Sequence, residues 1–230
     1  MSDYEKLLAL HDDLILRSRY VTDDATQGGS IVHLCRTGTG LCAAYTRTLQ
    51  LELDIAGIPN LVIEGDSGGP HTWNLVKIEG EWRHVDATWD DPTVPRGEES
   101  LLLHEYFCLS DADMARDHAW SKKGLPPVTK DKPLYLTRNG LYFGAHDYAA
   151  LFRAAERAAA QGATQFSAYM ADYGSVSRLN KEAERYMERG GQLRFNAVSA
   201  PRNRSRGTVT LLFEPAKNER KSDRSTKFTR

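Results

Sequence analysis

The chain has 230 residues, of which 40% are apolar and 27% are charged, a composition typical of a globular protein. That length accommodates one large domain or two small ones. No stretch approaches the roughly 18 apolar residues of a membrane span, and the N-terminus lacks the apolar run of a signal peptide, so we expect a cytoplasmic protein with no membrane partner. Because a core helix already begins near Tyr4, a fragment of an exported protein remains an alternative.

The three cysteines, Cys35, Cys42 and Cys108, are odd in number and show no CxxC spacing. This pattern argues against a disulfide framework and against a thiolate zinc site. Positive charge gathers near the C-terminus, where residues 201–230 hold 9 Lys and Arg against 3 Asp and Glu. Neither interleaved aromatic residues nor a nucleic-acid motif accompany that charge, so we expect a solvated tail and no nucleic-acid partner.

Helical spacing of apolar residues runs from Tyr4 to Arg19 and predicts an amphipathic helix with one buried face. A second helical pattern begins at Cys42, directly after Gly38-Thr39-Gly40-Leu41, and continues to Gly57, ahead of Pro59. Cys42 is therefore expected at or near a helix start.

The pattern then changes to short β-like runs, at Asn60 to Glu64, His71 to Ile78 and Glu81 to Trp89. The last two runs flank Glu79-Gly80 and predict a hairpin. A short helix is expected near Asp111 to Trp120, and we place a domain boundary close to residue 130.

The remaining chain alternates between strand and helix, which predicts a small α/β module. The expected elements are a strand at Leu134 to Phe143, a helix at Asp147 to Gln161, a strand at Gln165 to Ala171, a helix at Val176 to Arg189, and strands at Leu193 to Ser199 and Thr208 to Phe213. Three parts of the chain are thus predicted. Residues 1–130 form the domain that carries Cys42, residues 131–215 form the α/β module, whose role is unknown, and residues 216–230 form a basic, disordered tail.

A cysteine at a helix start is a candidate nucleophile. An ordinary thiol, with a pKa of about 8.5, is mostly protonated at neutral pH, and a helix N-terminus favours the thiolate. The same N–H groups can hold the oxyanion that forms when a thiolate attacks a carbonyl. Arg36 and Thr39 precede Cys42 where some cysteine hydrolases use an amide, so no helper side chain for the oxyanion is identified.

The hairpin supplies a candidate base and its partner. If Glu79-Gly80 is a two-residue turn, the numbers of paired residues sum to 159, and Trp73 lies opposite Asp86. His71 and Asp86 then share one face as diagonal neighbours, with Cβ atoms roughly 7 Å apart, close enough for a hydrogen bond between their side chains. A one-residue slip would place them on opposite faces.

Several ordered blocks resemble the transglutaminase-like superfamily. They are Gly40-Leu41-Cys42-Ala43-Ala44-Tyr45, Ala56-Gly57-Ile58-Pro59, His71-Thr72-Trp73-Asn74 and Trp82-Arg83-His84-Val85-Asp86-Ala87-Thr88-Trp89-Asp90. The resemblance covers roughly half of the chain, to about Trp120, and leaves residues 130 to 215 without a counterpart.

The resemblance implies an α+β fold with a papain-like core, in which a helix carrying the cysteine packs on an antiparallel sheet, followed here by the α/β module. It assigns Cys42 as nucleophile, His71 as base and Asp86 as orienter. The implied chemistry is amide acyl transfer or hydrolysis through a thioester, as in transglutaminases, deamidases and peptidases, with no cofactor. The substrate would be a protein, a peptide or a small amide, while the acceptor and the oligomeric state stay open.

Two other interpretations remain. The chain could be a binding module with an idle triad, or His71, His84 and Asp86 could hold a metal such as non-haem iron, although this leaves Cys42 unexplained. The other histidines are read as surface or core residues: His11, His33, His104, His118 and His146. Trp73, Trp82 and Trp89 are assigned to packing, with Trp73 and Trp89 as possible walls of the cleft.

Overall fold

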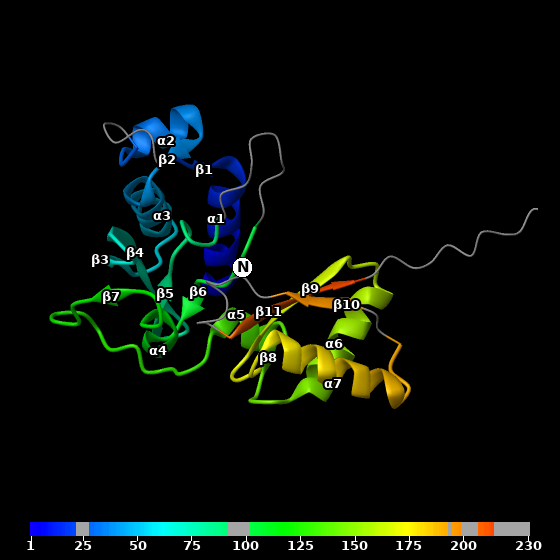
Figure 1. The fold of residues 1–230 in the computed structure, drawn as a ribbon. Coiled ribbons are helices and arrows are strands. Elements are labelled where there is room, and N and C mark those ends of the chain that lie inside the picture. The colour runs from blue at the N-terminus through cyan, green and yellow to red at the C-terminus, as the bar shows by residue number, and fades with distance from the viewer. Residues whose placement is uncertain (22–27, 92–101, 193–194, 199–206, 214–230) are drawn as a thin grey trace, which may run out of the picture.

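The computed structural model describes residues 1–21, 28–91, 102–192, 195–198 and 207–213. The described residues form a helix-and-sheet unit built from the N-terminal half of the chain and a smaller unit built from the C-terminal half (Figure 1). The predicted basic tail lies outside the described residues. Within the described part of the chain, no helix combines the length and apolarity that a bilayer crossing requires.

Three helices open the chain: α1 (Asp3–Arg17), α2 (Ile31–Thr37) and α3 (Cys42–Ile55). Ser2 and Glu5 cap the start of α1 reciprocally, which satisfies N–H groups that the first helical turn leaves without a partner. The sequence patterns did not predict α2, which Ser30 caps and which ends at Gly38 in the left-handed conformation (φ 69°). The predicted helix start at Cys42 is confirmed.

A five-stranded antiparallel sheet follows, in the order β6-β5-β4-β3-β7. Its strands are β3 (Asn60–Asp66), β4 (Pro70–Ile78), β5 (Glu81–Val85), β6 (Phe107–Leu109) and β7 (Ala119–Trp120). The predicted hairpin register is confirmed, because Asn74 pairs with Val85 and Ile78 pairs with Glu81. Glu79 (φ 54°) and Gly80 (φ 83°) are both left-handed, as a turn that matches the twist of the strands requires.

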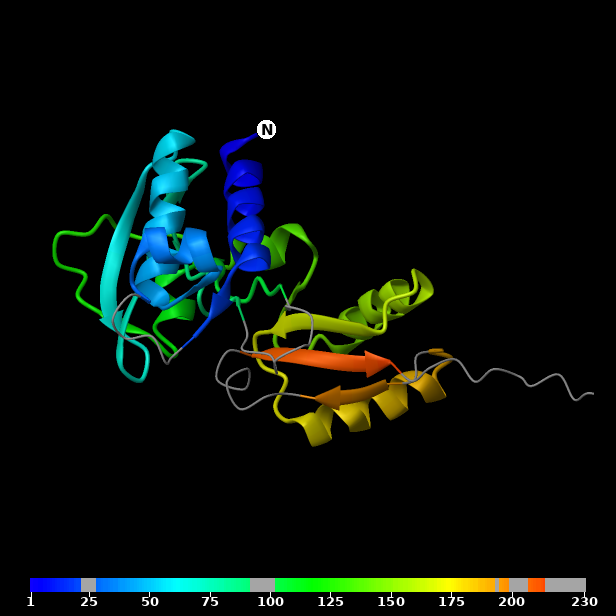
Figure 2. The ribbon, with the colours of Figure 1, turned by 90° about the horizontal axis from the view of Figure 1, so that it is seen from above.

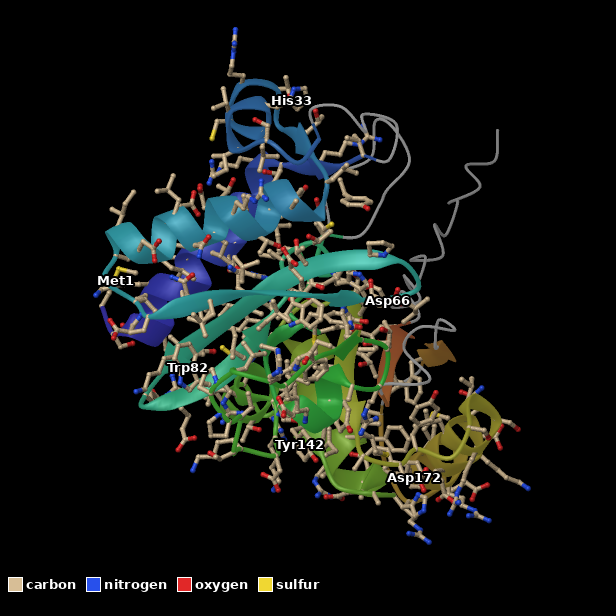
Figure 3. The ribbon with its side chains drawn as sticks, turned by 90° about the vertical axis from the view of Figure 1, so that its left-hand side faces the viewer. Met1, His33, Asp66, Trp82, Tyr142 and Asp172 are labelled. Atoms are coloured by element: carbon tan, nitrogen blue, oxygen red, sulfur yellow. The ribbon has the colours of Figure 1, made fainter. Side chains whose placement is uncertain are left out.

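Each face of this sheet is covered. Figure 3 shows α3 lying over one face of the sheet, and apolar side chains of α1 and α3 pack with Val76, Ile78 and Val85 in one core. On the other face Trp73 and Leu75 pack with side chains from residues 106–128. A further short parallel pair, β1 (Arg19–Tyr20) with β2 (Thr39–Gly40), ties the end of α1 to the chain just before Cys42.

The C-terminal unit has its own four-stranded sheet, in the order β10-β11-β9-β8, with α6 and α7 packed against it (Figure 2). Its elements are β8 (Tyr142–Phe143), α6 (Tyr148–Ala160), β9 (Gln165–Met170), α7 (Val176–Glu188), β10 (Phe195–Val198) and β11 (Thr208–Phe213). The expected small α/β module is therefore present, and the α+β class with an antiparallel sheet is confirmed.

One predicted element is wrong. Residues 134–143 form not one strand but a helix, α5 (Leu134–Arg138), followed by the short β8. Tyr135 stacks on His104 with ring centroids 4.1 Å apart, so tertiary packing against the N-terminal core decides the conformation of this apolar run. The helix expected near Asp111 to Trp120 is also shorter, since α4 covers Asp111–Met114 and the chain then extends into β7.

Candidate active site

Cys42 is the first residue of α3, and the chain approaches it through a tightly packed corner. A Cβ at Gly40 would lie 2.9 Å from the Cβ of Ala44 and 3.3 Å from the carbonyl oxygen of Gly28, so this position requires glycine. Leu41 occupies the N-cap and makes no side-chain hydrogen bond to the helix. The N–H groups of the first turn therefore lack the capping side chain that most helices supply.

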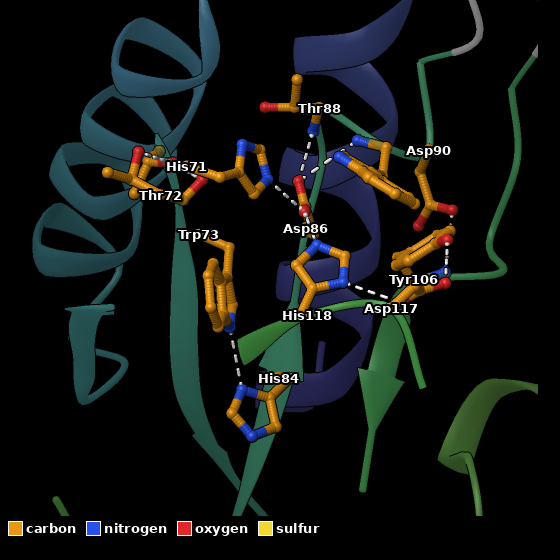
Figure 4. Close-up of polar contacts among 12 residues, drawn as sticks. His71, Thr72, Trp73, His84, Asp86, Thr88, Asp90, Tyr106, Asp117 and His118 are labelled. Atoms are coloured by element: carbon orange, nitrogen blue, oxygen red, sulfur yellow. Dashed lines mark hydrogen bonds and ion pairs between the residues drawn. The ribbon is translucent and has the colours of Figure 1, made fainter. Parts of the chain in front are cut away.

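His71 and Asp86 meet as the hairpin register predicts. His71 lies near the start of β4, Asp86 follows the last residue of β5, and Nε2 of His71 is 2.6 Å from Oδ2 of Asp86 (Figure 4). Both residues are buried. Cys42 and His71 line the same cavity, and the two side chains interact closely enough to shift the pKa of each other. With Nε2 of His71 turned to Asp86, Nδ1 is the ring nitrogen left for the thiol.

These contacts change the acidity of both groups. Burial by itself would raise the pKa of the Cys42 thiol, but hydrogen bonding to His71 and the charge of that imidazole lower it overall. Burial opposes the charged form of His71, yet the hydrogen bonds to Asp86 and Cys42 outweigh it and raise the pKa of His71 to about 9. The site therefore favours a thiolate beside an imidazolium.

The thiol opens into a cavity of about 290 Å³. Its wall is made by Tyr20, Cys42, Ser67, Gly68, Gly69, Pro70, His71, Thr88, Trp89 and Asp91. Asp91 accepts hydrogen bonds from the Tyr45 hydroxyl (2.5 Å) and from the Tyr20 N–H (3.2 Å). Of the two tryptophans expected as walls of the cleft, Trp89 lines this cavity, whereas Trp73 does not and is fully buried in the core.

A second imidazole reaches Asp86. His118, fully buried, places Nε2 3.1 Å from the same Oδ2 atom. The reading of His118 as an ordinary surface or core histidine missed this contact. Strand pairing explains it, because Gly65 pairs with His71 on one side and with Trp120 on the other, which brings residues 118–120 beside the site. No local sequence pattern predicts such a pairing of distant strands.

The metal set considered from the sequence is brought together only in part, because His71 meets Asp86 but His84 contacts other residues. Nδ1 of His84 accepts a hydrogen bond from Trp73 (2.9 Å), and Nε2 lies 2.9 Å from Asp111, away from His71. Trp73 must donate, so His84 carries its proton on Nε2 and is neutral. Burial lowers the pKa of His84, in agreement with that state.

Two other sets of side chains have ligand atoms within 4.8 Å of one another and could hold a metal ion. They are His71, Asp86 and His118, and the separate set His11, Asp12 and His104. In the first set the Asp86 oxygens already accept hydrogen bonds from both imidazoles and from backbone N–H groups. These hydrogen bonds fill the acceptor positions of the buried Asp86 carboxylate.

In the structure a helix that starts at Cys42 packs on the antiparallel sheet beside His71 and Asp86, which is the arrangement that the resemblance to the transglutaminase-like superfamily implies. Residues 1–87 match the family model of the transglutaminase-like superfamily, which confirms the resemblance seen in the sequence. Cys42, His71 and Asp86 all lie within the matched residues, whereas His118 lies beyond them.

The chain is similar to kyphoscoliosis peptidase of Mus musculus and of Homo sapiens. Each is 25% identical over 131 residues, which cover 50% of this chain and 20% of the relative, so the chain spans about a fifth of the length of these curated relatives. A crystal structure of a TGase is 18% identical over 38% of this chain and 27% of that one, with a TM-score of 0.35. A Cytophaga hutchinsonii structure provisionally named a cysteine protease is 21% identical over 43% and 35%, with a TM-score of 0.34.

Proposed function

We propose that this chain catalyses thiol-dependent acyl transfer from an amide, or hydrolysis of that amide, through a thioester on Cys42. The observation that carries the proposal is the place of His71, which lines one cavity together with Cys42 and holds its Nε2 2.6 Å from Oδ2 of Asp86. Nucleophile, base and orienter in such contact are the recurring arrangement of nucleophilic acyl-transfer sites.

In the first step the Cys42 thiolate attacks the amide carbonyl carbon, and a carbon–sulfur bond forms. The carbon–nitrogen bond then breaks as the His71 imidazolium donates its proton to the departing nitrogen. Asp86 holds the ring through Nε2, which leaves Nδ1 to exchange protons with the sulfur and the leaving group. The products of this step are a thioester on Cys42 and a free amine or ammonia.

The oxyanion of the tetrahedral intermediate would be held at the start of α3. The first N–H groups of a helix have no partner within the helix, and the Leu41 side chain cannot cap them. These donors and the positive end of the helix dipole would stabilise the carbonyl oxygen on which negative charge develops when Cys42 attacks. We assign the oxyanion to these backbone groups rather than to a helper side chain.

In the second step neutral His71 removes a proton from water or from an amine, which attacks the thioester. The carbon–sulfur bond breaks, and the thiolate and imidazolium are restored. Water gives the activity of a hydrolase or peptidase, and an amine gives that of an acyltransferase. The name of the curated relatives, a peptidase, belongs to the first of these two outcomes.

The test is intact-mass detection of acyl adducts on the wild type and on Cys42→Ala, with a library of glutamine-containing peptides and with or without an added amine. We expect adducts on the wild type, amine-dependent products if the acceptor is an amine, and neither in Cys42→Ala. Cys35→Ala is the matched control, since Cys35 is exposed on α2 and lies outside the cavity. Unchanged turnover in Cys42→Ala would refute the proposal.

A further inference from the structure

The Asp86 carboxylate makes four hydrogen-bond contacts. Its Oδ1 accepts the N–H groups of Thr88 (3.0 Å) and Trp89 (3.2 Å), and its Oδ2 lies 2.6 Å from Nε2 of His71 and 3.1 Å from Nε2 of His118. An ionised carboxylate offers about four acceptor positions. Oδ1 is therefore fixed by backbone, and Oδ2 is held between two imidazoles.

His118 is itself held on its far side. Its Nδ1 is 2.7 Å from Asp117, and the other oxygen of Asp117 accepts the Tyr106 hydroxyl at 2.8 Å (Figure 4). Its ring also packs against Trp89, at 4.6 Å between centroids, and edge-on against Trp73, at 5.0 Å. The ring has no freedom to turn away from Asp86 without breaking these contacts.

The two imidazoles do not compete equally for Oδ2. The contact to His71 is 0.5 Å shorter than the contact to His118, so His71 keeps the stronger hydrogen bond. His118 is a second hydrogen-bond donor to the same Oδ2 atom. It thereby stabilises the negative charge of the buried carboxylate and holds Oδ2 in its orientation toward the His71 ring. Removing a donor from a buried carboxylate is costly because the remaining charge loses its partner.

We propose that His118 is a positioning residue of the Cys42–His71–Asp86 site: it holds Oδ2 of Asp86 toward His71 and thereby maintains the thiolate–imidazolium pair. This inference rests on the proposed function. The titratable groups that face His118 are Asp86 after β5, His71 on β4, and Asp117 and Tyr106 on the segments that flank α4, with His84 of β5 nearby.

The experiment compares His118→Met with His118→Gln, both made in a Cys35→Ser background so that the exposed thiol does not react. Glutamine can place an N–H donor near the position of Nε2, whereas methionine has a similar length and shape without a donor. The readout is the rate of Cys42 alkylation by iodoacetamide from pH 4.5 to 9.5, located by peptide mapping. Buried Cys108 serves as the unreactive internal reference.

We expect reactive Cys42 at pH 5 in the background protein. His118→Met should shift the midpoint of the alkylation profile to higher pH by about one unit, so the alkylation rate at pH 5 falls about tenfold. His118→Gln should retain most of the rate of the background protein at pH 5. A loss of packing alone would lower the melting temperature of both variants without separating their profiles. The proposal is overturned if the methionine profile stays in place or moves downward, or if glutamine rescues nothing.

Asp117→Asn is the second variant, in case His118→Met does not fold. It removes the charge behind His118 and preserves the shape of the side chain, and we expect a smaller upward movement of the same profile. An unchanged profile in a folded Asp117→Asn protein contradicts the proposal. Failure of Cys42 to react selectively at pH 5 in the background protein would instead refute the proposed function, so the two failures are distinguishable.

Discussion

At the scale of single residues, the site depends on hydrogen bonds that outweigh burial. Burial disfavours charge on Cys42 and on His71, yet each group supplies the partner that the other needs, and Asp86 supplies a second partner to His71. Asp86 is ionised despite its burial, because hydrogen bonds from both imidazoles hold its pKa below the ordinary range. Each charge is therefore tolerable only in the presence of its neighbours.

This balance predicts how stability depends on pH. The folded protein raises the pKa of His71 from 6.5 to about 9, so the stability that protonated His71 contributes is complete below pH 6.5 and is lost as the pH rises through 9. We expect the difference in unfolding free energy between the wild type and His71→Gln to shrink between pH 6.5 and 9.5, by on the order of 3 kcal/mol. Urea unfolding at several pH values measures it, and a difference independent of pH would contradict the ion pair.

At the scale of elements, one strand position governs how closely the sheet can pack beside the site. Gly65 of β3 pairs with His71, and a Cβ there would lie 2.4 Å from the carbonyl oxygen of Ala119 and 2.6 Å from the Trp73 ring. The Trp73 ring in turn stacks on His71, with centroids 5.8 Å apart. The glycine therefore permits both the β3–β7 pairing and the stacking that flanks His71.

We predict that Gly65→Ala destabilises the protein by about 1 to 3 kcal/mol, as overpacking does, and slows the alkylation of Cys42. The reason is that Trp73 must move and His71 lies against it. Gly144→Ala is the matched control, because nothing lies near the added methyl group and the backbone there needs no left-handed conformation. Equal unfolding free energies for the two variants would show that the sheet relaxes around the methyl group.

At the scale of the whole molecule, two separate sets of buried residues suggest two folding units. The N-terminal clusters include Leu49 and Trp73, whereas the C-terminal cluster around Leu151 and Phe152 contains none of their members. The hydrogen bond from Arg116 to the Tyr169 hydroxyl (2.6 Å) links the units. We therefore propose that they unfold independently, in keeping with the domain boundary predicted near residue 130.

The four tryptophans, Trp73, Trp82, Trp89 and Trp120, all belong to the N-terminal unit and provide a test. Leu151→Ala, at a fully buried position, should cost about 2 to 5 kcal/mol in the C-terminal unit. We expect the far-ultraviolet circular dichroism transition to broaden toward lower denaturant, while tryptophan fluorescence and Cys42 reactivity stay unchanged. Leu49→Ala, its counterpart on α3, should shift the fluorescence transition, and a single coincident transition in both variants would refute the two-unit description.

Local physical rules were sufficient for part of this protein. The glycines before Cys42 and the helical spacing after it determined where α3 begins, and the two-residue turn at Glu79-Gly80 determined the register that puts His71 and Asp86 on one face. These features depend on residues close together in the chain, where backbone geometry and side-chain period leave few alternatives. The nucleophile, base and orienter could therefore be named as candidates from the sequence.

Tertiary structure alone decided the rest. His118 reaches Asp86 only because β7 joins β3 across more than fifty residues of chain. His84 turns toward Asp111 because Trp73 donates a hydrogen bond to it. Residues 134–138 become helical where Tyr135 packs on His104. Contacts between distant segments leave no periodic pattern in either segment, since each partner is ordinary by itself and only their packing gives it a role.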